Sequence, residues 1–203
     1  AHAPDCGARR STERKGGVTA PAKGIPRYQP FDGMAIFRHG FRPFFFGAGV
    51  WALLAMLLWL PVFEGTVALP TAFDPVSWHA HEMLFGFATA AIAGFLLTAI
   101  PNWTGRMPLQ GVPLITLFGV WLTGRVAVMF SELAGGGVAA LCDLAFLALL
   151  IAVVLREILA GRNWRNLPIP VALLGLLAAN AMMHAGVMEL AATGGYGRRL
   201  GIA

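Results

Sequence analysis

Charged side chains are scarce in this sequence, and their scarcity excludes a soluble domain. They make up 12% of the 203 residues, whereas about 25% is typical of soluble proteins. Hydrophobic residues make up 57%, and the mean hydropathy is +0.68. Several apolar runs are long enough to cross about 30 Å of hydrocarbon as helices. Because helices satisfy their own backbone in lipid, the composition predicts an all-α, polytopic transmembrane helical bundle.

Cysteine is almost absent as well. Cys6 and Cys142 form neither a disulfide framework nor a CxxC motif. The amino-terminal segment lacks the apolar core of a cleavable signal peptide. The sequence also has no phosphate-binding loop, no GxGxxG and no HExxH motif, and no catalytic triad is recognisable. Motifs therefore assign no reaction, and whether the protein is an enzyme stays open.

Lysine occurs only in the amino-terminal segment. The formal net charge is +5, and both lysines fall in the first thirty residues together with four arginines. Residues 1–36 are rich in glycine, proline and arginine and show no periodicity, which predicts a disordered basic cytoplasmic tail. Basic segments beside a membrane span orient the protein and contact anionic lipid. We therefore expect the lipid bilayer, and not nucleic acid, as the partner of this positive charge.

Apolar segments separated by proline and glycine predict a helical bundle over residues 37–192. The five expected spans are about 41–63, 78–100, 112–130, 138–159 and 169–190. Residues 193–203 are expected to form an external turn or a truncated link to further spans; in the second case we expect the chain to be part of a longer protein.

Arginine and lysine alternate between the loops. Eight lie in the tail and at the start of the first span. The loop after the second span carries Arg106, and the loop after the fourth carries Arg162 and Arg165 beside Arg156, whereas the loops after the first and third spans carry none. Cytoplasmic loops are enriched in these residues, so we expect the amino terminus in the cytoplasm. Arg198 and Arg199 then fall outside, mildly against the rule.

The most unusual stretch is Trp78–Phe87, which opens the second span with two histidines and a glutamate. Ionisable groups are expensive in hydrocarbon and therefore indicate a functional site. At α-helical spacing, His79 and Glu82 share a face, so we expect them to point into the bundle and His81 to lie around the helix from them. Small residues at steps of four continue that face and admit a neighbouring helix: Gly86, Ala90 and Gly94.

The rise per residue places other intramembrane polar groups at the depth of this stretch. With the amino terminus inside, the outer half of the later spans contains Arg125, Asp143, Asn180 and His184. We expect these groups to converge in one pocket with those of the second span. Local pairing is the alternative: Arg125 and Asp143 neutralise each other or Glu82, and Asn180 and His184 form an interhelical hydrogen-bond pair.

The donor types favour a transition metal. Imidazole beside Glu82 and Met83 suits copper or iron better than magnesium or calcium, which prefer oxygen ligands. Imidazoles in the core of a helical bundle also hold b-type haem. His39 lies at the inner end of the first span, a membrane thickness from the others, where it is either a further ligand or an interfacial cation beside two arginines.

Several strings resemble motifs of the NnrS family: Phe41–Phe45, Trp78–Phe87, Gly94–Gly105, Trp121–Arg125, and Asn180 with His184. The resemblance covers residues 37–190. It implies a bacterial inner-membrane protein that carries haem b and copper and is linked to denitrification and to nitrosative stress, with nitric oxide as a possible ligand. It also implies a carboxy-terminal half, with its own histidines, that helps to complete the site. By match to the family pattern, the metal candidates are His79, His81, Glu82 and His184. Around them we expect three residues that orient the ligands or balance charge: Arg125, Asp143 and Asn180.

Two hypotheses therefore remain. In the first, the protein binds haem and copper and takes part in tolerance of nitric oxide. In the second, it is a proton-coupled transporter whose relay comprises His81, Glu82, Arg125 and Asp143. Pro101 and Pro113 fall at span boundaries and not within spans, which weakens a broken-helix substrate site.

Overall fold

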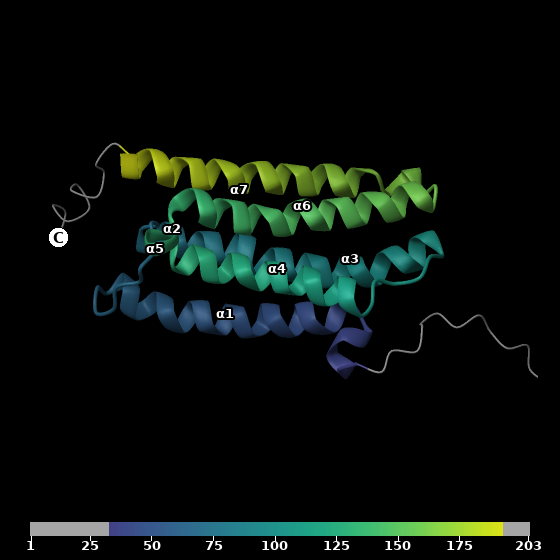
Figure 1. Cartoon of the computed structure of the whole chain (residues 1–203), viewed down its shortest axis with the longest axis horizontal. Helices are drawn as coiled ribbons and strands as arrows, with labels where there is room; N and C mark the ends of the chain where they lie inside the picture. Colours follow the sequence, from purple (N-terminus) through teal and green to yellow (C-terminus); the bar gives the residue numbers. More distant parts are fainter. Residues whose placement is uncertain (1–32, 193–203) are drawn as a thin grey trace, which may run out of the picture.

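The computed structural model describes residues 33–192, and within them it is a bundle of long helices lying side by side (Figure 1). The elements are η1 (Ala35–Arg38), α1 (Phe41–Phe63), α2 (Pro75–His81), η2 (Glu82–Ala88), α3 (Thr89–Thr104), α4 (Val112–Met129), α5 (Ser131–Ala134), α6 (Gly136–Ala160), η3 (Trp164–Asn166) and α7 (Pro168–Ala192). Five helices are long and apolar enough to cross a membrane, one of them running unbroken from α2 through η2 to α3. The described residues contain no strand, and the predicted all-α class is confirmed.

The second span is longer than the sequence predicts. It runs over Pro75–Thr104, whereas the apolar pattern indicated 78–100. Asp74 extends its beginning by accepting a hydrogen bond from the Ser77 amide at 3.0 Å, and Pro75 fits the first turn because that turn needs no amide donor. Gly105, at φ 69°, ends the helix in the left-handed conformation that glycine adopts without strain.

Both predicted terminal segments lie largely outside the described residues. Residues 1–32 and 193–203 are not described, so the disordered tail, the external turn, Cys6 and the pair Arg198 and Arg199 stay predictions. The last residues before the first span form the short 3₁₀ helix η1.

The helix made of α2, η2 and α3 is central to the bundle. In its most apolar window 56% of the residues are buried, against 28% for α1 and 22% for α7, and Figure 1 shows α1 and α7 on opposite sides. The predicted small-residue face permits this packing. A Cβ added at Gly94 would lie 3.3 Å from the Cβ of Phe44, so α1 approaches α3 closely there.

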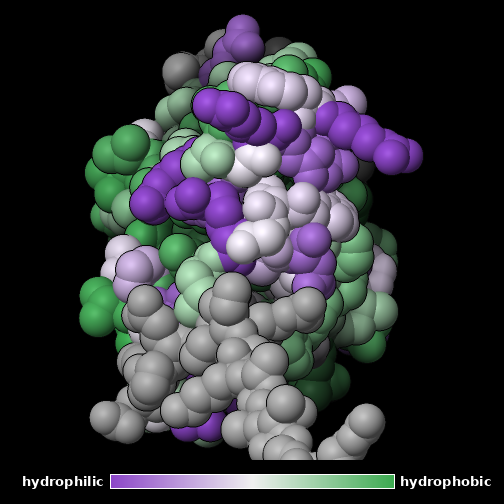
Figure 2. Space-filling model, turned by 90° about the vertical axis from the view of Figure 1, so that its right-hand side faces the viewer, coloured by the Kyte–Doolittle hydropathy of each residue, from purple (hydrophilic) through white to green (hydrophobic). Residues whose placement is uncertain are grey.

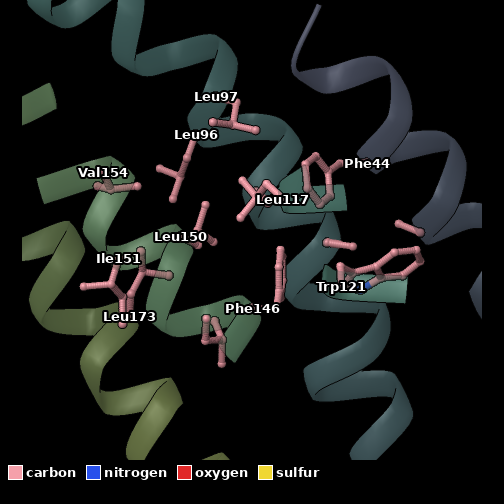
Figure 3. Packing of buried hydrophobic residues seen from close by; sticks show 14 of the residues in the cluster. Phe44, Leu96, Leu97, Leu117, Trp121, Phe146, Leu150, Ile151, Val154 and Leu173 are labelled. Carbon is pink, nitrogen blue, oxygen red and sulfur yellow. The ribbon is translucent and has the colours of Figure 1, made fainter. Parts of the chain in front are cut away.

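The large apolar core extends from the buried polar residues, where it includes Phe85 and Trp121, into the half of the bundle at which α3 ends. Figure 3 shows Leu96, Leu117, Phe146, Leu150 and Val154 meeting between the helices. The α3 and α6 residues among them lie in the half that ends at the α3–α4 loop, since α3 follows η2 and these α6 residues follow Asp143. Leu117 lies near the start of α4, at the same end. The opposite half contains the buried polar residues described below.

Charge also separates the two ends of the bundle within residues 33–192. The end at which α3 stops carries six arginines and one glutamate: Arg38, Arg42, Arg106, Arg156, Arg162, Arg165 and Glu157. The other end carries only acids outside the buried region: Glu64, Asp74, Glu132 and Glu189. This distribution is typical of a helical membrane protein with one cytoplasmic face.

Candidate metal centre

The buried polar site begins at a change of helix type. After α2, hydrogen bonding widens to the π pattern over Glu82–Ala88 before α3 resumes. A π turn contains about one residue more than an α turn. It therefore rotates the side chains that precede it about the helix axis relative to those that follow it. His81 and Glu82 are both fully buried, at 0% exposure. Such π segments often occur at functional sites.

This widening explains why the expected helical face differs from the structure. The α-helical pattern pointed His79 inward and His81 away. Instead, His81 lies within the bundle, and His79 is half-buried and stacks on Trp59, with ring centroids 4.5 Å apart. The added residue in the π turn moves His81 toward the face that carries Gly86.

Arg125 from α4 connects two buried carboxylates. Its Nη1 donates to Glu82 Oε2 at 2.8 Å, and its Nη2 donates to Asp143 Oδ1 on α6. All three side chains are at most 1% exposed. Gly124 permits the approach of α4 to α6, because a Cβ there would lie 3.0 Å from the Asp143 Cα. The predicted pairing of Arg125 with both acids is therefore present, and it leaves one negative charge over.

Asp143 Oδ2 is the meeting point of three side chains from two other spans. His184 Nε2 lies 3.0 Å from it, His81 Nε2 lies 3.2 Å from it, and Asn180 Nδ2 donates to it at 2.7 Å. Asn180 Oδ1 also lies 3.0 Å from His81 Nε2. The other edge of the His81 ring is held too, since its Nδ1 lies 3.2 Å from Glu82 Oε1.

His81, Asp143 and His184 form a group that could hold a metal ion. Each offers one donor atom, these atoms all lie within 4.8 Å of one another, and all three residues are buried. The two imidazole rings lie at 77° with centroids 5.1 Å apart. Phe73 packs against both imidazole rings, with its ring centroid 5.0 Å from that of His81 and 5.5 Å from that of His184. It therefore reduces access of water to the group.

Two tryptophans complete the site; Trp121 lies in one of the strings that resemble the family, whereas no sequence pattern indicated Trp51. Trp51 on α1 donates from Nε1 to Glu82 Oε2 at 2.7 Å. Trp121 on α4 donates from Nε1 to the Gly86 carbonyl at 3.0 Å, within the π turn. A tryptophan in an apolar span usually indicates packing or an interface, so only the fold distinguishes these donors. With Trp51 included, all five spans contribute to the site.

Three candidate residues lie outside this site. Met83 packs in a separate apolar cluster with Trp78. His79 has a buried Nδ1 for which the described structure provides no hydrogen-bond partner. His39 lies at the other end of the bundle beside Phe41, and its pKa is held below the ordinary value by burial and then by the positive charges of Arg42 and Arg38.

The described structure provides a pocket near the buried site. It has a volume of about 480 Å³, and its lining includes Ser131, Glu132, Val187 and Met188. Val187 and Met188 follow His184 by one helical turn on α7. The pocket therefore opens beside the end of the bundle that contains the three donors.

Comparison with known proteins agrees with the resemblance stated above. The family model described as NnrS protein matches residues 35–203. No curated protein and no solved structure matches the chain.

Proposed function

The chain belongs to the NnrS family, and from this premise we propose that it is a metal-binding membrane protein that acts in tolerance of nitric oxide. One observation carries the proposal. His81, Asp143 and His184 come from three different spans, yet their donor atoms lie within 4.8 Å of one another in a buried group. We propose that these residues hold a single copper ion.

The chemistry of the donors supports copper. Two imidazoles and one carboxylate suit copper, iron or zinc, whereas magnesium and calcium prefer shells made only of oxygen. Charge supports a bound cation as well, because the two negative charges of Glu82 and Asp143 exceed the single positive charge of Arg125. An unbalanced buried charge is expensive, and either a bound cation or a second proton on an imidazole offsets it.

The surrounding residues would orient the ligands. Glu82 contacts His81 Nδ1, which leaves Nε2 directed toward Asp143. Asn180 donates to the Asp143 carboxylate and holds it between the two histidines. Partners of this kind fix ring orientation and tautomer in metal sites. Copper held there would supply a one-electron redox centre and a position for a small ligand such as nitric oxide.

Haem does not fit between these histidines. His81 Nε2 and His184 Nε2 converge on the same carboxylate oxygen, so a macrocycle cannot lie between the two rings. A haem b bound by this protein would need another ligand. Within the described chain, His79 is the candidate, because its buried Nδ1 lacks a partner there. We propose that a haem site would combine His79 with residues of the carboxy-terminal half that the resemblance implies.

We propose an orientation with the amino terminus in the cytoplasm of a bacterium and the metal group in the outer half of the inner membrane. The arginines of the described chain gather at the end where α1 begins, and the exposed acids gather at the other end. Arginine and lysine are enriched on the cytoplasmic side of membrane proteins.

A proton-coupled transporter is the second candidate, and one observation favours it. The buried polar side chains form a continuous series of contacts that needs no bound ion: His184–Asp143–His81–Glu82–Arg125. Such buried networks serve as proton relays in transporters. In this reading an imidazolium, and not a metal, supplies the remaining positive charge.

Metal analysis of purified variants separates the two candidates. We expect full-length protein from copper-supplemented cells to contain copper, and His81→Gln and His184→Gln to lose it while remaining folded by circular dichroism. Glutamine retains a polar side chain but lacks the imidazole. His39→Gln is the matched control and should keep its copper. Copper retained in both site variants would exclude the proposed ligands, and lost proton-coupled flux in those variants would then favour the transporter.

A further inference from the structure

A second pocket lies at the basic end of the bundle, far along the helices from the metal group. It has a volume of about 490 Å³ and is formed by the end of α3, the α3–α4 loop and the last turns of α6. Its lining is of two kinds. Leu97, Ile100 and Val153 provide apolar walls, while Arg106 and Arg156 provide guanidinium groups. None of these residues takes part in the site described above.

The pocket carries a net positive charge. Among the described residues that line it, the one acid is Glu157, which accepts a hydrogen bond from Arg106 Nε at 2.5 Å. Arg156 lies farther from the same carboxylate, with its Nε 3.9 Å from Oε1, and its side chain is 72% exposed. Glu157 therefore satisfies Arg106 and leaves most of the donor capacity of Arg156 free for another oxygen ligand.

The pocket also lies at the depth of a membrane boundary. Helix α3 ends at Thr104, α4 begins at Val112 and α6 ends at Ala160, so three spans terminate around it. Trp103 and Trp164, at the same end, are of the type that marks membrane–water interfaces. Figure 2 views this end and shows hydrophilic side chains gathered on it, with hydrophobic side chains at the margins.

From this combination we infer that the pocket binds the phosphate of an anionic phospholipid. Arg156 contacts the phosphate, and the apolar side chains of Met107 and Val153 in the lining contact the beginning of an acyl chain. Basic pockets between membrane helices bind anionic head groups on the cytoplasmic side. A free phosphate ion would leave the apolar walls without a partner, and a zwitterionic head group would gain less from the excess positive charge.

Lipid titration of the full chain tests the inference. The purified protein in a neutral detergent is titrated with phosphatidylglycerol, with phosphatidylcholine of the same acyl chains, and with inorganic phosphate, and its melting temperature is recorded. We expect stabilisation by phosphatidylglycerol at concentrations at which the other two have little effect. Equal stabilisation by both lipids would overturn the inference, and equal stabilisation by phosphate would replace the lipid with a soluble anion and overturn it as well.

Substitutions assign the effect to this pocket. Arg156→Gln should weaken phosphatidylglycerol binding about fivefold, which corresponds to one surface arginine facing an anionic lipid. Arg156→Lys should restore most of the affinity because it restores the charge. Arg165→Gln is the matched control, since Arg165 is exposed at the same end but does not line the pocket. An equal loss in Arg165→Gln would show general attraction by the basic face and refute a specific site. Copper content should be unchanged in all three variants, so failure here is distinguishable from failure of the metal proposal.

Discussion

Gly86 provides the sharpest test of the buried site, because its missing side chain makes room for the charge network. A Cβ added there would lie 2.7 Å from Glu82 Oε2, 2.8 Å from Arg125 Nη1 and 2.8 Å from Trp51 Nε1. Both nitrogens already donate to Glu82 Oε2, so none of the three atoms can move away without loss of a buried hydrogen bond. Gly86→Ala should therefore destabilise the protein, although alanine is intrinsically the better helix former by about 1 kcal/mol.

The expected magnitude follows from overpacking in a rigid polar environment. Insertion of one methyl group into a well-packed interior costs about 1–3 kcal/mol, and separation of a buried ion pair adds to this cost. We expect a net loss of about 2 kcal/mol and a melting temperature lower by about 4–8 °C. Thermal unfolding in detergent, followed by near-ultraviolet circular dichroism of the tryptophans, measures the change.

Gly119→Ala is the matched control. Gly119 lies within α4, and a Cβ added there meets nothing within 4 Å. This variant should be as stable as the parent or more stable by up to about 1 kcal/mol. If Gly86→Ala unfolds at the same temperature as Gly119→Ala, the π turn does not hold the network as described.

Two further variants test other parts of the structure. Asn180→Leu removes the amide that contacts both Asp143 and His81. We expect copper affinity to fall about 10- to 100-fold, as found for partners of metal ligands. A titration with a competing chelator measures this affinity, and an unchanged value would contradict the orienting role of Asn180. His39→Asn tests pH dependence. Because the pKa of His39 is lowered in the folded protein, its neutral form favours the fold, so this contribution to stability is present above about pH 6.5 and is lost as the pH falls below it. The melting temperature should therefore change less between about pH 7 and 5 in the variant than in the parent, and equal changes would refute the assignment.

The sequence predicted the helical spans well because their signals are local. Hydropathy and length locate a membrane helix, whereas its ends are less certain: the second span extends beyond the predicted 78–100, from Pro75 to Thr104. The depth of the polar residues was predictable for a similar reason. The rise per residue is constant, so Arg125, Asp143 and His184 could be placed at one level before any contact was known.

The angular arrangement was not predictable in the same way. Residue spacing assumes a constant turn, and the π segment at Glu82–Ala88 breaks that assumption. His79 and His81 consequently exchange their expected surroundings, since His81 contacts Asp143 and His79 stacks on Trp59. The hydrogen bond from Trp51 to Glu82 was also not predictable from the sequence, because a bond between α1 and η2 depends on how two distant segments pack.

The order of charges along the chain has a consequence for membrane insertion. A single arginine or aspartate at the centre of a span opposes insertion by about 2.5–3.5 kcal/mol. Here Glu82 is synthesised first, Arg125 second and Asp143 third, and each later group bonds to its predecessor in the finished bundle. Each later span that inserts into the bilayer therefore meets a side chain of opposite charge that is already there. Exchange of Arg125 and Asp143 would preserve the composition but bring two acids into the lipid in succession, with no guanidinium between them.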